Sequence, residues 1–206
     1  MPSKYSWDIV GYANGLVCVR NYTDGGIALW NPSIQKLKKI PEPHAQPPSP
    51  ELELHNYGFG YDSTNDDYKL VQIVEMANEN DIFVSHQVSV YSLKANSWKR
   101  IQDIPSSGYG YPVGFFDIVF VNGALGWLMW VELLDPQCII VTLDLESEKY
   151  RAFPIPVDRV DIRDRYTPYL KILGDYLCIC LNLWSGWDFW IMKEWKDRIV
   201  EPALFY

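Results

Sequence analysis

Long hydrophobic runs are missing from this sequence of 206 residues. Its apolar stretches are interrupted well before the ~18 residues that a membrane-spanning helix requires. The first residues also lack the apolar region of a secretory signal. These two absences predict a protein without a membrane partner, located in the cytoplasm, the nucleus or both.

Positive charge is also scarce. The sequence has 18 Lys and Arg against 26 Asp and Glu, which gives a formal net charge of -8 at pH 7. A chain of this charge repels phosphate backbones, so sequence-independent binding to nucleic acid is not expected.

Cysteine is limited to four residues in apolar runs, far fewer than a small disulfide-rich secreted domain contains. Reduced, buried thiols are therefore expected. Cys178 and Cys180 lack the second pair that a zinc site needs, and the three histidines have no ligand spacing. No phosphate-binding glycine loop, nucleophile elbow or Ser, His and Asp set is present. We expect no metal, no cofactor and no enzymatic activity.

Aromatic residues, in contrast, are plentiful. They make up 15% of the chain, with 9 Trp and 14 Tyr. Helical periodicity is hard to find, while short β-branched and aromatic runs recur between turn residues. This pattern is typical of an all-β sandwich, barrel or propeller.

An internal repeat separates these three alternatives. The segments 29–41, 90–101 and 142–154 align without a gap. Each has an aromatic residue or Leu, a short polar turn, and a second large apolar residue seven positions later. The first two segments then continue with a basic pair and Ile.

Tight hairpins mark the start of the repeat units. Asn14-Gly15, Asn122-Gly123 and Gly174-Asp175 each lie between two apolar runs, and such pairs favour two-residue hairpin turns. Corresponding points lie 61, 52 and 48 residues apart, from Trp30 to Tyr91, to Leu143 and to Ile191. A period of about 50 residues with four strands predicts kelch-type propeller blades.

The prediction is one domain, 1–206, with about four blades, in a closed or incomplete propeller. The four units cover residues 7–41, 57–105, 115–156 and 169–195. Unit four has no clear candidate for its last strand.

Several motifs occur in the order and spacing of a known family. They are residues 10–18, 29–33, 57–70, 90–93, 96–98, 122–125 and 190–194. Across roughly residues 8 to 195 the chain resembles the F-box-associated interaction domain of plant F-box proteins. The resemblance implies a kelch-like β-propeller that captures a target protein for ubiquitination in a Skp-cullin-F-box ubiquitin ligase, without a catalytic site.

The resemblance also sets an expectation about the adaptor. The family's F-box precedes this region, whereas this sequence opens almost directly on its first repeat unit. We therefore expect the Skp-type adaptor and the cullin to be reached only through an F-box that is missing from this chain.

The repeated aromatic residues are expected in the core. Trp30, Tyr91, Trp98 and Tyr150 occupy repeat positions, and a requirement that recurs in every blade is typical of packing between blades.

Aromatic residues that break the repeat are the candidates for partner binding. They are Tyr109 and Tyr111 in a Gly-rich connection, and Trp184 and Trp187 near a hairpin tip. Exposed Trp and Tyr are common in binding hot spots. They also suit stacking on sugars, so a carbohydrate-binding, lectin-like propeller remains an alternative. A propeller enzyme of the oxidase or sialidase type lacks its catalytic residues.

Overall fold

The chain is divided into two compact units, Met1–Ile104 and Pro105–Tyr206. The computed structural model describes residues 7–21, 23–43, 52–77, 83–104, 118–131, 137–155, 168–183, 186–194 and 199–203. Each unit has two sheets of its own.

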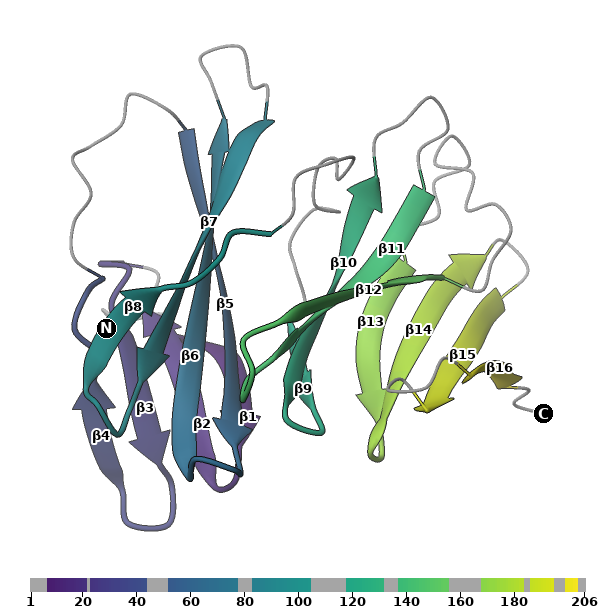
Figure 1. The fold of residues 1–206 in the computed structure, drawn as a ribbon. Helices are drawn as coiled ribbons and strands as arrows, with labels where there is room; N and C mark the ends of the chain where they lie inside the picture. Colours follow the sequence, from purple (N-terminus) through teal and green to yellow (C-terminus); the bar gives the residue numbers. More distant parts are fainter. Residues whose placement is uncertain are drawn as a thin grey trace, which may run out of the picture. The chain divides into compact units, whose positions relative to one another are not determined.

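Unit 1 contains two four-stranded antiparallel sheets. The first sheet consists of β1 (Trp7–Ala13), β2 (Leu16–Asn21), β3 (Ile27–Asn31) and β4 (Lys36–Lys39), in that order. The second consists of β5 (Leu52–Asp62), β6 (Asp67–Ala77), β7 (Phe83–Ser92) and β8 (Ser97–Arg100). Figure 1 shows the turns β1–β2, β3–β4 and β5–β6 at one end of this unit.

Unit 2 repeats the arrangement. Its first sheet consists of β9 (Val119–Val121), β10 (Ala124–Val131), β11 (Gln137–Asp144) and β12 (Tyr150–Pro154). Its second consists of β13 (Pro168–Leu173), β14 (Tyr176–Leu183), β15 (Gly186–Glu194) and β16 (Ile199–Ala203).

The all-β prediction is confirmed, and each sheet has the up-and-down strand order of a propeller blade. Among the described residues there is no helix. Strand β16 lies beyond the range 169–195 expected for unit four. It pairs with β15 at the edge of its sheet, which is where a strand that contains a proline, here Pro202, is tolerated.

The repeat register is confirmed by strand pairing. Residues seven positions apart face each other across three hairpins: Trp30 pairs with Leu37, Tyr91 with Trp98, and Leu143 with Tyr150. The three turns also share a backbone conformation, because Gln35, Asn96 and Glu148 all have φ between 53° and 55°.

Side chains close these turns in the same way. Asn31 Oδ1 accepts from the Ile34 amide at 3.3 Å, and Asp144 Oδ1 accepts from the Ser147 amide at 2.7 Å. The β5–β6 turn has the same form, with Asp62 Oδ1 accepting from the Asn65 amide at 3.1 Å. Such side-chain bonds to the backbone stabilise turns at this position.

In unit 1, β1 lies against β5. Gly11 makes this close approach possible, because a Cβ added there would lie 3.4 Å from the Cβ and the carbonyl oxygen of Phe59. Trp98 Nε1 donates to the Pro41 carbonyl at 2.6 Å and Tyr68 Oη donates to the Asn14 carbonyl at 2.7 Å. The two sheets of unit 1 are therefore joined by packing and by hydrogen bonds.

The expectation that the repeated aromatics are core residues is wrong for Trp30. Tyr91 is fully buried, Trp98 and Tyr150 are half-buried, and Trp30 is 41% exposed. Equivalent positions lie on the equivalent face of each sheet. In unit 1, the first sheet covers the Tyr91 face of the second sheet, because Phe59 and Trp98 on that face contact Gly11 and Pro41. The Trp30 face of the first sheet is exposed, with Tyr12 and Leu37 beside Trp30.

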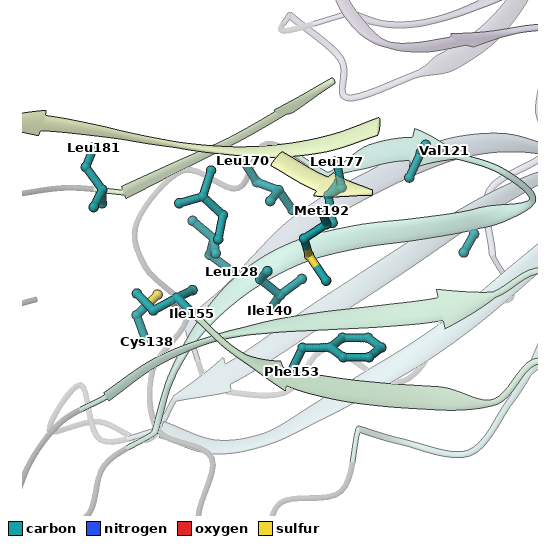
Figure 2. Packing of buried hydrophobic residues seen from close by; sticks show 12 residues of the cluster. Val121, Leu128, Cys138, Ile140, Phe153, Ile155, Leu170, Leu177, Leu181 and Met192 are labelled. Carbon is teal, nitrogen blue, oxygen red and sulfur yellow. The ribbon is translucent and has the colours of Figure 1, made fainter. Parts of the chain in front are cut away.

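The core of unit 2 is apolar and lies between its two sheets. Figure 2 shows Leu170, Leu177 and Met192 directed towards side chains of β10 to β12. The cluster consists of Val121, Ala124, Leu128, Cys138, Ile140, Phe153, Ile155, Leu170, Leu177, Ile179, Leu181 and Met192. This packing fixes which face of the sheet β13–β16 turns away from the core.

Candidate functional site: an aromatic face on strands β13 to β15

Side chains alternate between the two faces of the sheet β13–β16. Leu170 and Ile179, which pair across β13 and β14, belong to the core. The next positions along the strands point the other way, and there Tyr169 pairs with Cys180, which pairs with Phe189. We call this second face, with Lys171 and Trp187, the aromatic face.

Three rings form a row on the aromatic face. The ring centroids of Tyr169 and Trp187 are 6.2 Å apart, and those of Trp187 and Phe189 are 6.4 Å apart with an interplanar angle of 23°. Trp187 is 53% exposed and Tyr169 is 40% exposed. The rings therefore support one another and still present a large surface to solvent.

The row borders a shallow hollow of about 500 Å³, lined by Tyr169, Lys171, Cys180, Trp187 and Phe189. A second hollow of about 330 Å³ shares three of these residues. It is lined by Lys171, Ile172, Leu173, Cys178, Cys180 and Phe189. The two hollows give the aromatic face an elongated shape that extends towards the β13–β14 turn.

The cysteines on this face are packing residues. All four cysteines of the chain are free and buried, as the sequence predicted. Burial raises the pKa of Cys178 to about 12, with a further contribution from Cys180. Because the reactive form of cysteine is the thiolate, these neutral thiols are poor nucleophiles and weak metal ligands.

The chemistry available on the aromatic face is contact through aromatic and apolar groups. The described residues that line the two hollows are Tyr, Trp, Phe, Leu, Ile, Cys and Lys. Flat, partly exposed rings over an apolar floor gain free energy by covering apolar surface and by stacking on a partner. Lys171 adds one positive charge beside the rings.

Of the four residues predicted to bind a partner, the structure places Trp187 on this face. Tyr109, Tyr111 and Trp184 lie outside the described residues. Tyr169 and Phe189 were not predicted, because both lie within strands and not at loop tips. The alternation of Tyr169, Lys171 and Leu173 along β13 is the sequence signal that locates them.

No group of three or more His, Cys, Asp or Glu side chains among the described residues is arranged to hold a metal ion. None of the described segments forms a helix long and apolar enough to cross a membrane.

Comparison with known proteins gives consistent relatives. The sequence profile of the F-box associated beta propeller domain matches residues 2–201. The F-box protein CPR1 of Arabidopsis thaliana is 30% identical over 206 residues, which cover 93% of this chain and 50% of that protein. An F-box/kelch-repeat protein of the same plant is 27% identical over 205 residues, covering 96% of this chain and 54% of that protein.

A solved α-L-arabinofuranosidase from Clostridium thermocellum is 12% identical, with a TM-score of 0.44 over 96% of this chain and 72% of its own. A likeness of this extent adds nothing about function. The chain spans about half the length of the curated relatives it matches. Because the profile match covers nearly all of its length, the chain belongs to the family of F-box associated β-propeller domains.

Proposed function

We propose that this chain is a non-catalytic module that recognises a target protein for a Skp-cullin-F-box ubiquitin ligase. Its family and its F-box relatives support this role. One relative is named as an F-box/kelch-repeat protein, which supports a kelch-like propeller. The adaptor and the cullin would be bound through an F-box outside this chain, in the cytoplasm or the nucleus.

The observation that carries the proposal is the aromatic face. Trp187 and Tyr169 are exposed, and they stand over a hollow whose lining is almost entirely apolar. Large exposed rings around an apolar depression are typical of protein hot spots, where truncation to Ala costs more than about 2 kcal/mol of binding free energy. We infer that an apolar side chain of the target occupies the hollow.

A carbohydrate ligand is the second candidate, and one observation favours it. The rings of Trp187 and Phe189 are close to parallel, at 23°. Aligned rings of this kind offer a platform for the flat face of a sugar. The lectin-like alternative is therefore kept as an outcome of the test.

The test is affinity capture from a plant extract with three forms of the chain. The wild type and Tyr12→Ala should retain the same protein, because Tyr12 is 73% exposed on β1 and lies on the other unit. Trp187→Ala should lose that protein while its circular dichroism and melting temperature stay unchanged.

Two results would contradict the proposal. Equal capture by Trp187→Ala would remove the aromatic face from recognition. Saturable binding to a glycan array, abolished by Trp187→Ala and unaccompanied by any captured protein, would establish the carbohydrate alternative. The ubiquitin-ligase role is checked separately, by ubiquitin transfer to the captured protein in a ligase assembled from this chain fused to an F-box.

A further inference from the structure

A second group of polar residues lies in unit 1, where the end of β2 meets the first half of β5. Arg20 of β2 is half-buried. Its Nη1 donates to the His55 carbonyl at 3.3 Å, and its guanidinium carbon lies 5.1 Å from the centroid of the Tyr57 ring. The stacking and the hydrogen bond hold the guanidinium group in one orientation.

Part of the hydrogen-bonding capacity of this guanidinium is unused. Arg20 Nε is buried and has no hydrogen-bond partner among the described residues. The ion pairs Lys69–Asp62 and Arg100–Asp103 do not include Arg20. A guanidinium group has five N–H donors. A partly buried cation with unpaired donors favours an anion as a neighbour.

Tyr57 provides a further donor beside it. Its hydroxyl oxygen accepts from Gln72 Nε2 at 3.0 Å, and the same nitrogen lies 3.1 Å from His55 Nδ1. Burial raises the pKa of Tyr57, so the hydroxyl remains protonated at neutral pH. A tyrosine hydroxyl both accepts and donates, and here the accepting role is already filled by Gln72.

We propose that Arg20 and Tyr57 form a binding site for a carboxylate group of the target protein. The guanidinium matches a carboxylate with two parallel N–H···O bonds, and the Tyr57 hydroxyl supplies another donor to the same group. This inference rests on the proposed function, because it takes the carboxylate from the target. It concerns unit 1, whereas the aromatic face belongs to unit 2.

Phosphate is the competing anion. Glu42, an exposed carboxylate, acts electrostatically on Tyr57. A phosphate group carries up to two negative charges at neutral pH, so it is both attracted more strongly by Arg20 and repelled more strongly by Glu42 than a carboxylate with one. Charge alone does not separate the two anions. The proposal commits to the carboxylate, and inorganic phosphate serves as the competing probe.

The experiment uses the whole chain, labelled with ¹⁵N, and small probes. The Nε–Hε resonance of Arg20 is assigned by its loss in Arg20→Lys. The chain is titrated with N-acetylglutamate amide, with the neutral N-acetylglutamine amide, and with inorganic phosphate. The glutamate probe should shift the Arg20 resonance with a Kd on the order of 1 mM, as expected for one charge-assisted contact.

Two variants and a control sharpen the result. Tyr57→Phe keeps the ring and removes the hydroxyl, so the glutamate probe should bind about fivefold more weakly. Arg20→Lys keeps the charge and removes the fork, so binding should fall about tenfold. In this variant the titration is followed through the backbone amide resonance of Tyr57, because the Nε–Hε resonance is no longer present. Arg100→Lys should leave binding unchanged, because Arg100 is already paired with Asp103 at 2.7 Å.

Three outcomes would overturn the inference. They are the absence of a saturable shift with the glutamate probe, equal binding of the glutamine probe, and phosphate binding as tight as glutamate binding. If Arg20→Lys does not fold, Tyr57→Phe and the glutamine probe still show whether the site binds a carboxylate. These measurements need no target, so they stand even if capture through the aromatic face fails.

The source of the carboxylate is tested with the captured protein. Arg20→Lys should reduce its capture, while Arg100→Lys should not. Arg20→Lys could capture the target as well as the wild type does, while the glutamate probe binds the wild type as expected. That result would assign the site to a free carboxylate and overturn its assignment to the target.

Discussion

The buried side chains of the two units differ in chemistry, although the strand pattern is the same. In unit 1 the buried residues include six polar or charged side chains on β5, β6 and β7: Asp62, Asp67, Lys69, Gln72, Glu75 and His86. In the described part of unit 2 the buried polar residue is Thr142, and the core cluster is apolar. The repeat therefore fixes strands and turns, but not the polarity of the side chains that become buried.

The polar residues of unit 1 connect neighbouring turns. Lys69 Nζ lies 2.9 Å from Asp62 Oδ2, with side chains that are 9% and 1% exposed. Asp67 accepts from Ser92 Oγ at 2.5 Å and from the Lys94 amide at 2.9 Å, which links the β5–β6 turn to the β7–β8 turn. An ion pair and hydrogen bonds stabilise this part of unit 1, whereas apolar packing stabilises the core of unit 2.

The largest expected effect is in the apolar core of unit 2. Leu177→Ala should lower the free energy of unfolding by about 3 to 4 kcal/mol, because the side chain is fully buried and its loss leaves a cavity. Urea unfolding at pH 5 and pH 8 should give the same loss, since the cluster around Leu177 has no group that titrates there. Leu173→Ala, at an exposed position, is the control, and an equal loss there would contradict the assignment.

The next largest effect is expected when one partner of the buried ion pair of unit 1 is replaced. Lys69→Met should cost about 3 kcal/mol, because the carboxylate of Asp62 stays buried without its cation. Lys38→Met, at an exposed position on β4, should change the unfolding free energy little. Adding Asp62→Asn to Lys69→Met should recover part of the loss. A double variant no more stable than Lys69→Met alone would show that charge burial is not the cause.

The third prediction concerns pH and is specific to unit 1. Burial lowers the pKa of His86 to about 4, against an opposing effect of Asp103. The folded pKa lies below the ordinary value of 6.5, so the contribution to stability is complete above pH 6.5 and is lost as pH falls through about 4. Across β6 and β7, His86 pairs with Glu75.

The pKa shift of Glu75 has the opposite direction, and so has its effect on stability. Burial raises its pKa from 4.5 to about 7, against the hydrogen bond from Asn56. Its contribution is complete below pH 4.5 and is lost as pH rises through about 7. Between pH 4.5 and 6.5 the two contributions change in opposite directions and largely cancel, so unit 1 should be most stable at mildly acidic pH and lose stability on either side.

Hydrogen exchange read separately for the two units measures this difference. Glu75→Gln should stabilise unit 1 by about 1 to 2 kcal/mol at pH 8 and leave it unchanged at pH 4.5, because glutamine still accepts from Asn56 and carries no charge. The core strands of unit 2 should be unaffected at both pH values. A stabilisation of unit 1 that does not depend on pH would contradict the role of ionisation.

The smallest effect should be equal in the two units. Gln35 and Glu148 occupy the same turn position with φ of 53° and 55°, a conformation that glycine adopts at lower cost. Gln35→Gly and Glu148→Gly should each raise stability by up to about 1 kcal/mol, less the backbone entropy that glycine loses on folding. Thermal unfolding that shifts in one variant and not in the other would show that the turns are not equivalent.

The strand register could be predicted from the sequence because it is decided locally. Trp30 and Leu37, Tyr91 and Trp98, and Leu143 and Tyr150 lie seven positions apart on either side of a short turn, and turn chemistry fixes such pairings. Asn14-Gly15 and Asn122-Gly123 form hairpin turns with positive φ at all four residues, as their composition predicted.

Which aromatic residues are buried, and where the exposed ones gather into a site, depended on which surface lies against each strand. Trp30 and Tyr91 occupy equivalent repeat positions, yet the first is exposed and the second is buried, because within unit 1 a neighbouring sheet covers the face of the second alone. Likewise, Tyr169 and Phe189 are distant in sequence and meet Trp187 only when β13, β14 and β15 are paired.

By itself the sequence determined the all-β class, the four-stranded units and their hairpins, because these depend on alternation and on turn residues a few positions apart. The tertiary structure decided which aromatic residues are buried, where an exposed aromatic row forms, and that Arg20 is held against Tyr57. The physical reason is that contacts between strands distant in sequence are set by the packing of whole sheets, and no short pattern records which face of a sheet will be covered.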